Sequence, residues 1–135
     1  MISKESNKDM IFRKLKHRLS KEEHVVFAYV HGSFLDGNDF NDVDIAIFLD
    51  QKIEATLSVD FEISLSLKLE RSLDVSVDVK ILNSSPLNFR YHATKGKLIL
   101  DRDAAIREDF LCRTWSDYFD FKPVAKIYLQ EVFSA

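Results

Sequence analysis

Two pairs of polar residues lie close together in the first third of the sequence. Gly32 and Ser33 end one apolar run, and Asp42 and Asp44 open the next. If the second run forms a strand, Asp42 and Asp44 point to one face and Val43 points to the other. Neighbouring carboxylates repel one another unless a cation neutralises them, and Mg²⁺ is the hard cation that binds carboxylate and phosphate oxygens together. The Asp pair therefore predicts a magnesium site.

Gly32-Ser33 has the properties of a phosphate-binding turn. Glycine lets the backbone approach a ligand closely, and the serine adds a hydroxyl and an amide donor. A short helix starting at residues 33–35 would place further amides beside Ser33. The two pairs together predict a site that binds a phosphate next to a metal ion.

The order Gly-Ser, short spacer, Asp-x-Asp resembles the nucleotidyltransferase superfamily of the DNA polymerase β type. This core takes up most of a short chain, from about residue 25 to about residue 121. In that respect the chain resembles the minimal nucleotidyltransferases (MNT), the antitoxins of HEPN/MNT toxin–antitoxin pairs. It departs from the family in the spacer, residues 34–41, which is shorter than usual. Asp36-Gly37 also stands where the family often has Arg-Gly, so a positive charge that would favour nucleotide binding is missing.

The resemblance implies a third carboxylate on the strand that follows a crossover helix. Asp78 is the match, because VDVKILNSSP resembles the family's third-carboxylate strand and the proline-led helix after it. Asp74, four residues earlier on the same face of the predicted strand, is the alternative.

The resemblance also implies a role for each site residue. Asp42 and Asp44 would bind both of two Mg²⁺ ions. Asp78 would complete the site of the ion on the acceptor side and take the acceptor's proton. Gly32 and Ser33 would hold the β- and γ-phosphates of ATP. As isolated acidic residues at a strand start, the Asp pair would more often be simply solvated, so the site prediction depends on the whole constellation.

The implied function is transfer of AMP from ATP to a hydroxyl, that of a tyrosine, on a cognate HEPN toxin, which silences the toxin. One alternative is a catalytically weak or inactive MNT-type module that neutralises a HEPN partner by binding alone. A second is transfer to a small molecule such as an aminoglycoside, for which nothing beyond the core suggests a pocket.

Other residues are weaker candidates. His31 precedes the glycine and would point either at the site or into the core, and packing in the core is the favoured interpretation. Arg90 and Lys80 would supply positive charge near phosphates, although a solvated or structural role is more common for such residues. Cys112 is predicted to lie in the core.

Aromatic residues are concentrated near the C-terminus. They exceed what one helix face buries easily, so they predict either core packing or a surface for a homo- or hetero-oligomeric partner. They are Trp115, Tyr118, Phe119, Phe121, Tyr128 and Phe133.

Composition limits the classes of function. With 135 residues, the chain is predicted to be one domain, residues 1–135, with a C-terminal helical segment at about 103–135. A net charge of −3 argues against direct nucleic-acid binding. One cysteine suits a reducing cytoplasm, and no apolar run predicts a signal peptide or membrane span.

The pattern of elements predicts an α/β fold, a small mixed sheet flanked by helices, with C-terminal helices. Residues 57–71 alternate between apolar and polar residues as a strand does, but their length, their helix-forming residues and the family resemblance favour a helix. The predicted strands are residues 24–30, 42–49, 74–82 and 97–100. The predicted helices are residues 8–22, 33–35, 57–71, 103–119 and 123–133, the last two separated by a break at Pro123. A further helix is predicted before Gly96, with Ser84 or Ser85 as its N-cap and Pro86 at its first position.

Overall fold

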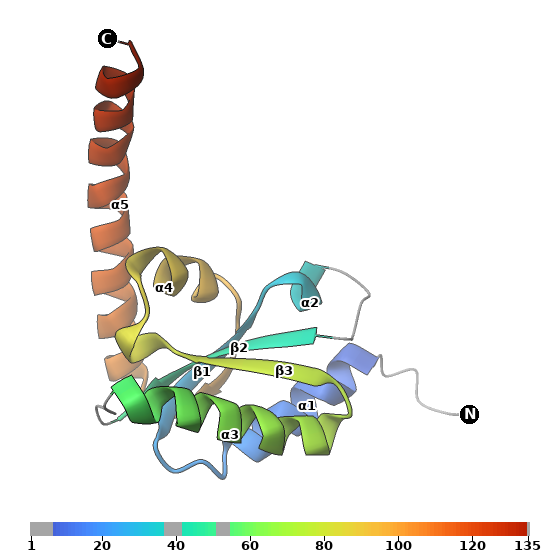
Figure 1. The fold of residues 1–135 in the computed structure, drawn as a ribbon. Coiled ribbons are helices and arrows are strands. Elements are labelled where there is room, and N and C mark those ends of the chain that lie inside the picture. The colour runs from blue at the N-terminus through green and yellow to red at the C-terminus, as the bar shows by residue number, and fades with distance from the viewer. Residues whose placement is uncertain (1–6, 37–41, 51–54, 135) are drawn as a thin grey trace.

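The computed structural model describes residues 7–36, 42–50 and 55–134 (Figure 1). It is an α/β fold with a mixed sheet of four strands in the order β3-β2-β1-β4. Its elements are α1 (Asn7–Leu19), β1 (Val25–His31), α2 (Ser33–Asp36), β2 (Asp42–Leu49), α3 (Ala55–Leu73), β3 (Ser76–Ile81), η1 (Leu82–Ser84), α4 (Leu87–Ala93), β4 (Lys97–Asp101) and α5 (Ala104–Ser134).

The strands combine antiparallel and parallel pairing. β1 is antiparallel to both β2 and β4, whereas β2 and β3 are parallel. Parallel neighbours need a crossover connection, and α3 provides it. The helix predicted for residues 57–71 is therefore confirmed.

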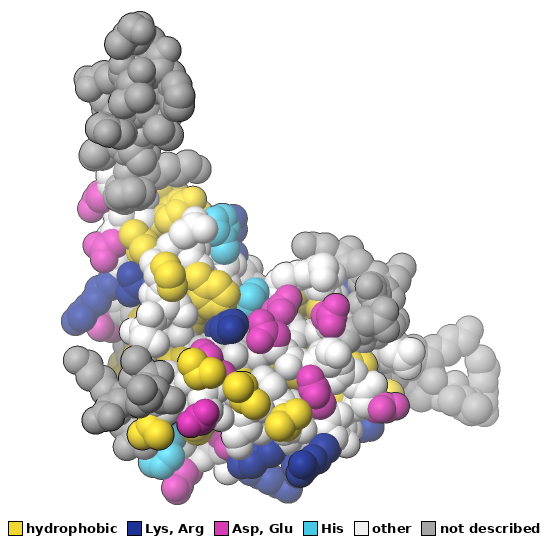
Figure 2. All heavy atoms as spheres, viewed as in Figure 1, with side chains coloured by type: hydrophobic (Ala, Val, Ile, Leu, Met, Phe, Trp, Pro, Cys, Tyr) yellow, Lys and Arg dark blue, Asp and Glu magenta, His cyan; other side chains and the backbone are white. Residues whose placement is uncertain are grey.

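The alternating sequence of α3 produces two apolar stripes on a helix. Every second apolar residue falls on one stripe, because residues four apart share a helix face. Leu65 and Leu69 are buried against the sheet, while Val59, Ile63 and Leu67 are half exposed, at 54%, 54% and 50%. Figure 2 shows the resulting row of apolar side chains along α3.

The two faces of the sheet carry separate apolar clusters. On one face, α1 and α3 cover side chains that include Val43, Ile45 and Val79. On the other, α4 and the first turns of α5 pack over residues that include Phe27 and Ala46. In Figure 1, α1 and α3 accordingly lie below the sheet and α4 above it, and α5 extends well past α4. Within the described parts of the chain, no helix has the length and apolar character that a bilayer crossing requires.

Two predicted boundaries and one predicted helix cap are wrong. β3 starts at Ser76, because Asp74 adopts a left-handed conformation, φ 58°, at the end of α3. Pro86 caps α4 with an extended ψ of 154°, so the helix starts at Leu87. Ser85 Oγ does not cap α4 but donates to the Ile81 carbonyl at 2.6 Å, closing the short 3₁₀ turn η1.

The C-terminal helical segment is also more continuous than expected. The predicted break at position 123 is wrong, since the backbone is helical from Ala104 to Ser134. A proline inside a helix removes one hydrogen bond and crowds one carbonyl, and a long helix tolerates such a local loss.

Candidate functional site

The register of the sheet brings the predicted carboxylates together. β2 pairs with β3 so that Asp44 lies opposite Asp78 and Asp42 lies opposite Ser76. On its other side, Asp44 is the partner of His31 at the end of β1. Asp44 therefore occupies the middle of a row that runs across three strands.

The carboxylates face away from the α1 and α3 layer. Val43 and Ile45, their neighbours in the chain, are fully buried in the cluster on that side. Asp42 and Asp44 thus lie on the face that α4 and α5 cover in part, as the strand period predicts. Asp78 shares this face, because Val77 and Val79 are buried on the other. Asp42 and Asp78 are exposed, and Asp44 is partly buried.

The environment of Asp44 opposes its ionisation. Burial raises its pKa above the usual value, and the nearby charges of Asp78 and Asp42 act in the same direction, whereas His31 lowers it. An unneutralised carboxylate is thus disfavoured at this position. A bound cation would relieve this cost.

Gly32 makes the close approach that the turn requires. Its φ is +82°, and a Cβ built there would lie 2.5 Å from Asp44 Oδ2. Ser33 follows as the first residue of α2, with an exposed side chain, while Phe34 is fully buried and anchors the turn. Gly32 and Ser33 therefore lie directly beside Asp44. The side chain of Asp36 and the loop at residues 37–41 lie outside the described residues.

His31 has a closer relation to the site than its sequence context indicated. Its Nε2 is buried and has no hydrogen-bond partner among the described residues. The ring meets Phe89 of α4 edge-on, with centroids 5.4 Å apart. Burial lowers the pKa of His31, although Asp44 and Asp78 raise it. His31 therefore both packs against α4 and lies near the carboxylates. In the sequence, only its position directly before Gly32 indicates that it lies near the site.

The remaining candidates are distributed around the site. Lys80 Nζ is 4.0 Å from Asp78 Oδ1, and both side chains are about half exposed or more. Asp74 lies outside β3, two residues before the position that pairs with Asp42. Arg90 lies on α4 and lines a neighbouring cavity.

The predicted burial of Cys112 is wrong, since its side chain is exposed. Its neighbours Leu111 and Thr114 face inward on α5, and the helix turn between them places position 112 outside.

The C-terminal aromatic residues divide between packing and exposure. Tyr118 stacks on Tyr91 of α4 at 3.7 Å, and Trp115 Nε1 donates to Thr94 Oγ1 at 3.1 Å. Phe119 is 51% exposed. The side chains of Phe121, Tyr128 and Phe133 lie outside the described residues.

The three carboxylates suit a hard divalent cation by their chemistry. With the side chains as they stand, the described residues contain no group of three or more His, Cys, Asp or Glu placed to hold a metal ion. The oxygen donors and the raised pKa of Asp44 nevertheless fit Mg²⁺. Asp42, Asp44 and Asp78 are the residues that would hold it.

Comparison with known structures identifies the fold. A chain of the crystal structure of the MntA–HepT toxin–antitoxin is 20% identical, with a TM-score of 0.64, over 94% of this chain and 97% of that one. A toxin–antitoxin structure with AMP-PNP gives 19% identity and a TM-score of 0.68 over 89% and 98% of the two chains. A chain of a complex of tri-AMPylated HEPN toxin with MNT antitoxin from Shewanella oneidensis gives 21% identity and a TM-score of 0.63, over 94% of this chain and 96% of that one.

Comparison by sequence identifies the family. No curated protein matches the chain. The model of the family described as polymerase beta, nucleotidyltransferase, matches residues 13–105, more than half of the chain, including both the Gly-Ser turn and all three carboxylates. The chain therefore belongs to the polymerase β-type nucleotidyltransferase family.

Proposed function

We propose that the protein transfers AMP from ATP to a tyrosine hydroxyl of a HEPN-family toxin, in a magnesium-dependent reaction, and so neutralises the toxin. Family membership supports nucleotidyl transfer. Similarity to chains from toxin–antitoxin structures, one with an AMPylated HEPN toxin and one with AMP-PNP, supports the partner and the nucleotide.

The observation that carries the proposal is the pairing of Asp44 with Asp78 across two parallel strands, with Asp42 on the same face. Acidic residues that are merely solvated have no need to converge on a partly buried position. Here Asp44 is held against Gly32, where any side chain would collide with it. The arrangement is what a site needs if it binds a metal–nucleotide complex.

The reaction is an in-line displacement at phosphorus. The acceptor oxygen attacks the α-phosphorus of ATP and forms the new O–P bond, while the bond to the bridging oxygen breaks and pyrophosphate leaves with the electron pair. Such transfers depend mainly on positioning and charge stabilisation. Gly32 and Ser33 hold the β- and γ-phosphates, and Asp78 accepts the proton that the acceptor hydroxyl loses.

Asp42, Asp44 and Asp78 would hold the metal. When bound there, Mg²⁺ would supply positive charge against the charge that develops on the reacting oxygens. Asp44 lies between the other groups and would bind the ion from the centre of the site. His31, with its pKa lowered, remains neutral beside Asp44 and so does not replace the cation electrostatically at neutral pH.

The test is incubation of the purified protein with its cognate HEPN toxin, ATP and Mg²⁺, followed by intact mass measurement of the toxin. We expect added AMP units on the toxin, mapped by fragmentation to a tyrosine, and none with EDTA. Silencing of the toxin by the wild-type protein without added mass would contradict the proposal and favour neutralisation by contact. The shortened loop with Asp36 would then be examined first, by asking whether Asp36→Arg improves ATP binding.

A further inference from the structure

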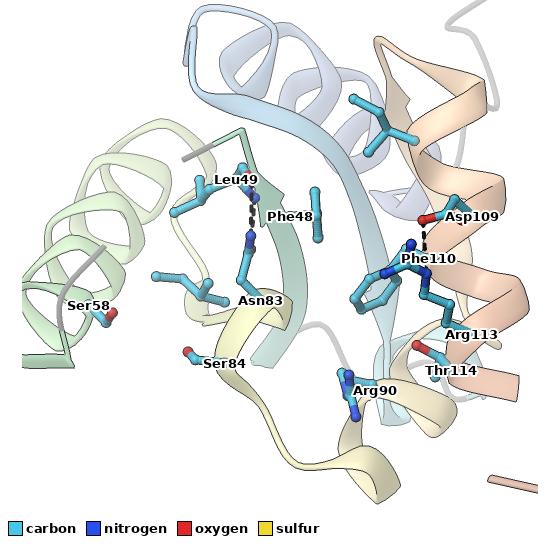
Figure 3. Close-up of a pocket in the computed structure, with 12 residues that line it drawn as sticks. Phe48, Leu49, Ser58, Asn83, Ser84, Arg90, Asp109, Phe110, Arg113 and Thr114 are labelled. Carbon is cyan, nitrogen blue, oxygen red and sulfur yellow. Dashed lines mark hydrogen bonds and ion pairs between the residues drawn. The ribbon is translucent and has the colours of Figure 1, made fainter. Parts of the chain in front are cut away.

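A cavity opens where β2 and β3 end, between this end of the sheet and the helices α4 and α5. Its volume is about 410 Å³, and its walls come from β2, η1, α4 and α5, with Ser58 of α3 at one side (Figure 3). Phe48 on β2 and Phe110 on α5 contribute apolar surface, and Arg90 and Thr114 contribute polar groups. Nothing in the proposed chemistry described above uses this space.

Two buried polar atoms in the cavity wall lack partners. Arg90 Nε and Thr114 Oγ1 make no hydrogen bond within the described residues. Thr114 is only 1% exposed, so water in the open solvent does not satisfy it. Figure 3 shows the two side chains at the end of the cavity where α4 meets α5. Buried groups without partners are costly, so a pair of them in one wall indicates a ligand that completes both.

Two aromatic rings form another part of the wall, Phe48 on β2 and Phe110 one helix turn from Thr114 on α5, and their planes are tilted by 59°. The rings of Phe48 and Phe110 lie 5.0 Å apart, and Phe48 is itself stacked on Phe27 at 4.9 Å, which fixes its plane. The amide of Asn83 is already used, since it bonds both the N–H and the carbonyl of Leu49. The cavity thus combines aromatic surface with one unused donor and one unused hydroxyl.

The charge of the lining does not suit a polyphosphate. Arg113 forms an ion pair with Asp109 at 3.2 Å, and both residues belong to the lining. Among the described residues of the lining, Arg90 is then the only cation outside this pair. A planar heteroaromatic ring, which carries hydrogen-bond donors and acceptors on its edge, fits this combination better than a phosphate chain.

The cavity and the proposed catalytic site lie at different points along β2, and the described lining of the cavity includes none of the three carboxylates. Phe48 follows Asp44 on the same face of β2, about 13 Å along the strand at about 3.3 Å per residue. On α4, Phe89 contacts His31, the neighbour of Asp44, and the next residue, Arg90, lines the cavity. A nucleotide with its α-phosphate at the carboxylates can therefore extend its base toward the cavity.

We propose that this cavity holds the nucleobase of the nucleoside triphosphate, with Thr114 Oγ1 and Arg90 Nε bonding the polar edge of the base. The proposal rests on the proposed function, because it assigns the nucleotide's base to a place beside that site. It makes Arg90 and Thr114 determinants of which nucleotide the protein uses.

The test separates base binding from phosphate binding. The affinity of the full chain is measured by calorimetry for Mg²⁺–AMP-PNP and for Mg²⁺–tripolyphosphate, which has no base. Thr114→Val removes the hydroxyl and keeps the shape, Thr114→Ser restores the hydroxyl, and Ser116→Ala on the exposed side of α5 is the matched control. We expect Thr114→Val to weaken AMP-PNP binding about tenfold, the loss typical of a buried hydrogen bond, without affecting tripolyphosphate.

Thr114→Val should also change the preference among adenine, guanine and cytosine nucleotides, and Thr114→Ser should restore most of the wild-type preference. An equal loss for AMP-PNP and tripolyphosphate would overturn the proposal, since the wall would then act on phosphates or on the fold. Unchanged AMP-PNP binding with a raised KM for the toxin would also overturn it, because the cavity would then receive the acceptor. In both cases wild-type nucleotide binding persists and the proposed function stands. If the wild-type protein binds neither probe, the proposed function and the base site fail together.

Discussion

At Asp44, the stability of the fold and the proposed chemistry favour different charge states: the fold favours a neutral side chain, and metal binding needs a carboxylate. Burial and two neighbouring carboxylates raise its pKa, while strand pairing on both sides fixes its backbone between β1 and β3. Gly32 adds to this confinement, because Asp44 Oδ2 occupies the space that a Cβ would need. A cation bound as we propose would relieve this cost.

Replacing Asp44 by asparagine separates these two demands. Asp44→Asn keeps the size and removes the charge, so we expect AMP transfer to the toxin to fall at least about 100-fold, as when a transition-state stabiliser is lost. The melting temperature of the metal-free protein should stay the same or rise slightly. The checks are intact mass of the toxin and thermal unfolding. A large fall in melting temperature would mean that Asp44 is structural.

The pH dependence of this variant follows from the raised pKa of Asp44. When the pKa in the folded protein lies above the unfolded value, the protonated form favours folding at low pH, and stability is lost as the pH rises through the folded pKa. The stability gained by Asp44→Asn should therefore be larger at pH 7 than below the ordinary pKa of an aspartate, about 4. Urea unfolding without metal at both pH values measures it, and equal gains would contradict the account.

Gly32→Ala should damage both the fold and the site. Its φ of +82° costs a residue with a Cβ about 1–2 kcal/mol, and the Cβ would also displace the Asp44 carboxylate. We expect a loss of stability of at least that size in urea unfolding, together with loss of transfer. Ser33→Ala is the control, since its exposed side chain should affect only nucleotide affinity.

At the scale of elements, α3 does more than connect two parallel strands. β3 is an edge strand, and its outward N–H groups would otherwise be free to pair with another chain. Side chains at successive turns of α3 accept these hydrogen bonds. Glu62 accepts from Ile81 N–H at 2.8 Å, Ser66 from Val79 N–H at 3.1 Å and Glu70 from Val77 N–H at 3.0 Å.

Ser66→Ala tests this capping of the edge. It removes the acceptor for Val79 N–H, and we expect a loss of about 1 kcal/mol in unfolding free energy. Amide exchange at Val79 should become faster, while Ser64→Ala, at an exposed position of the same helix, should change neither quantity. Unchanged exchange at Val79 would show that water satisfies this N–H equally well.

At the scale of the whole molecule, the sheet carries an apolar cluster on each face and the site at one end. The face toward α1 and α3 is closed, whereas α4 and α5 cover only part of the other, leaving the carboxylates accessible. Binding a metal–nucleotide complex there would stabilise the folded state as a whole, because the unfolded chain has no such site.

Thermal unfolding with ligand and with a chelator tests this coupling. At about 100 times the dissociation constant, Mg²⁺–AMP-PNP should add about 2.7 kcal/mol, which corresponds to roughly 10 °C in melting temperature for a domain of this size. EDTA should abolish the shift, and Asp44→Asn should reduce it strongly. A full shift in EDTA would show that the nucleotide binds without the metal.

The sequence alone was sufficient for the strand that carries the Asp pair, although it misplaced the starts of β3 and α4 and predicted a break in α5. The i, i+2 spacing of Asp42 and Asp44 in a strand, Val43 on the opposite face and the strand at residues 42–49 all follow from the period of a β-strand. The helix at α3 was different, because its alternating pattern favoured a strand. The resemblance to a family, and the crossover between parallel strands, decided in favour of a helix.

Only the tertiary structure decided which distant residues meet. The register between β2 and β3 places Asp78, and not Asp74, opposite Asp44, and the antiparallel register of β1 adds His31 to the same row. No local periodicity encodes such a register, since it depends on how the apolar faces of separate strands pack together. The cavity with Arg90 and Thr114 arises in the same way, because packing of α4 and α5 on the sheet buries these polar groups without giving them partners.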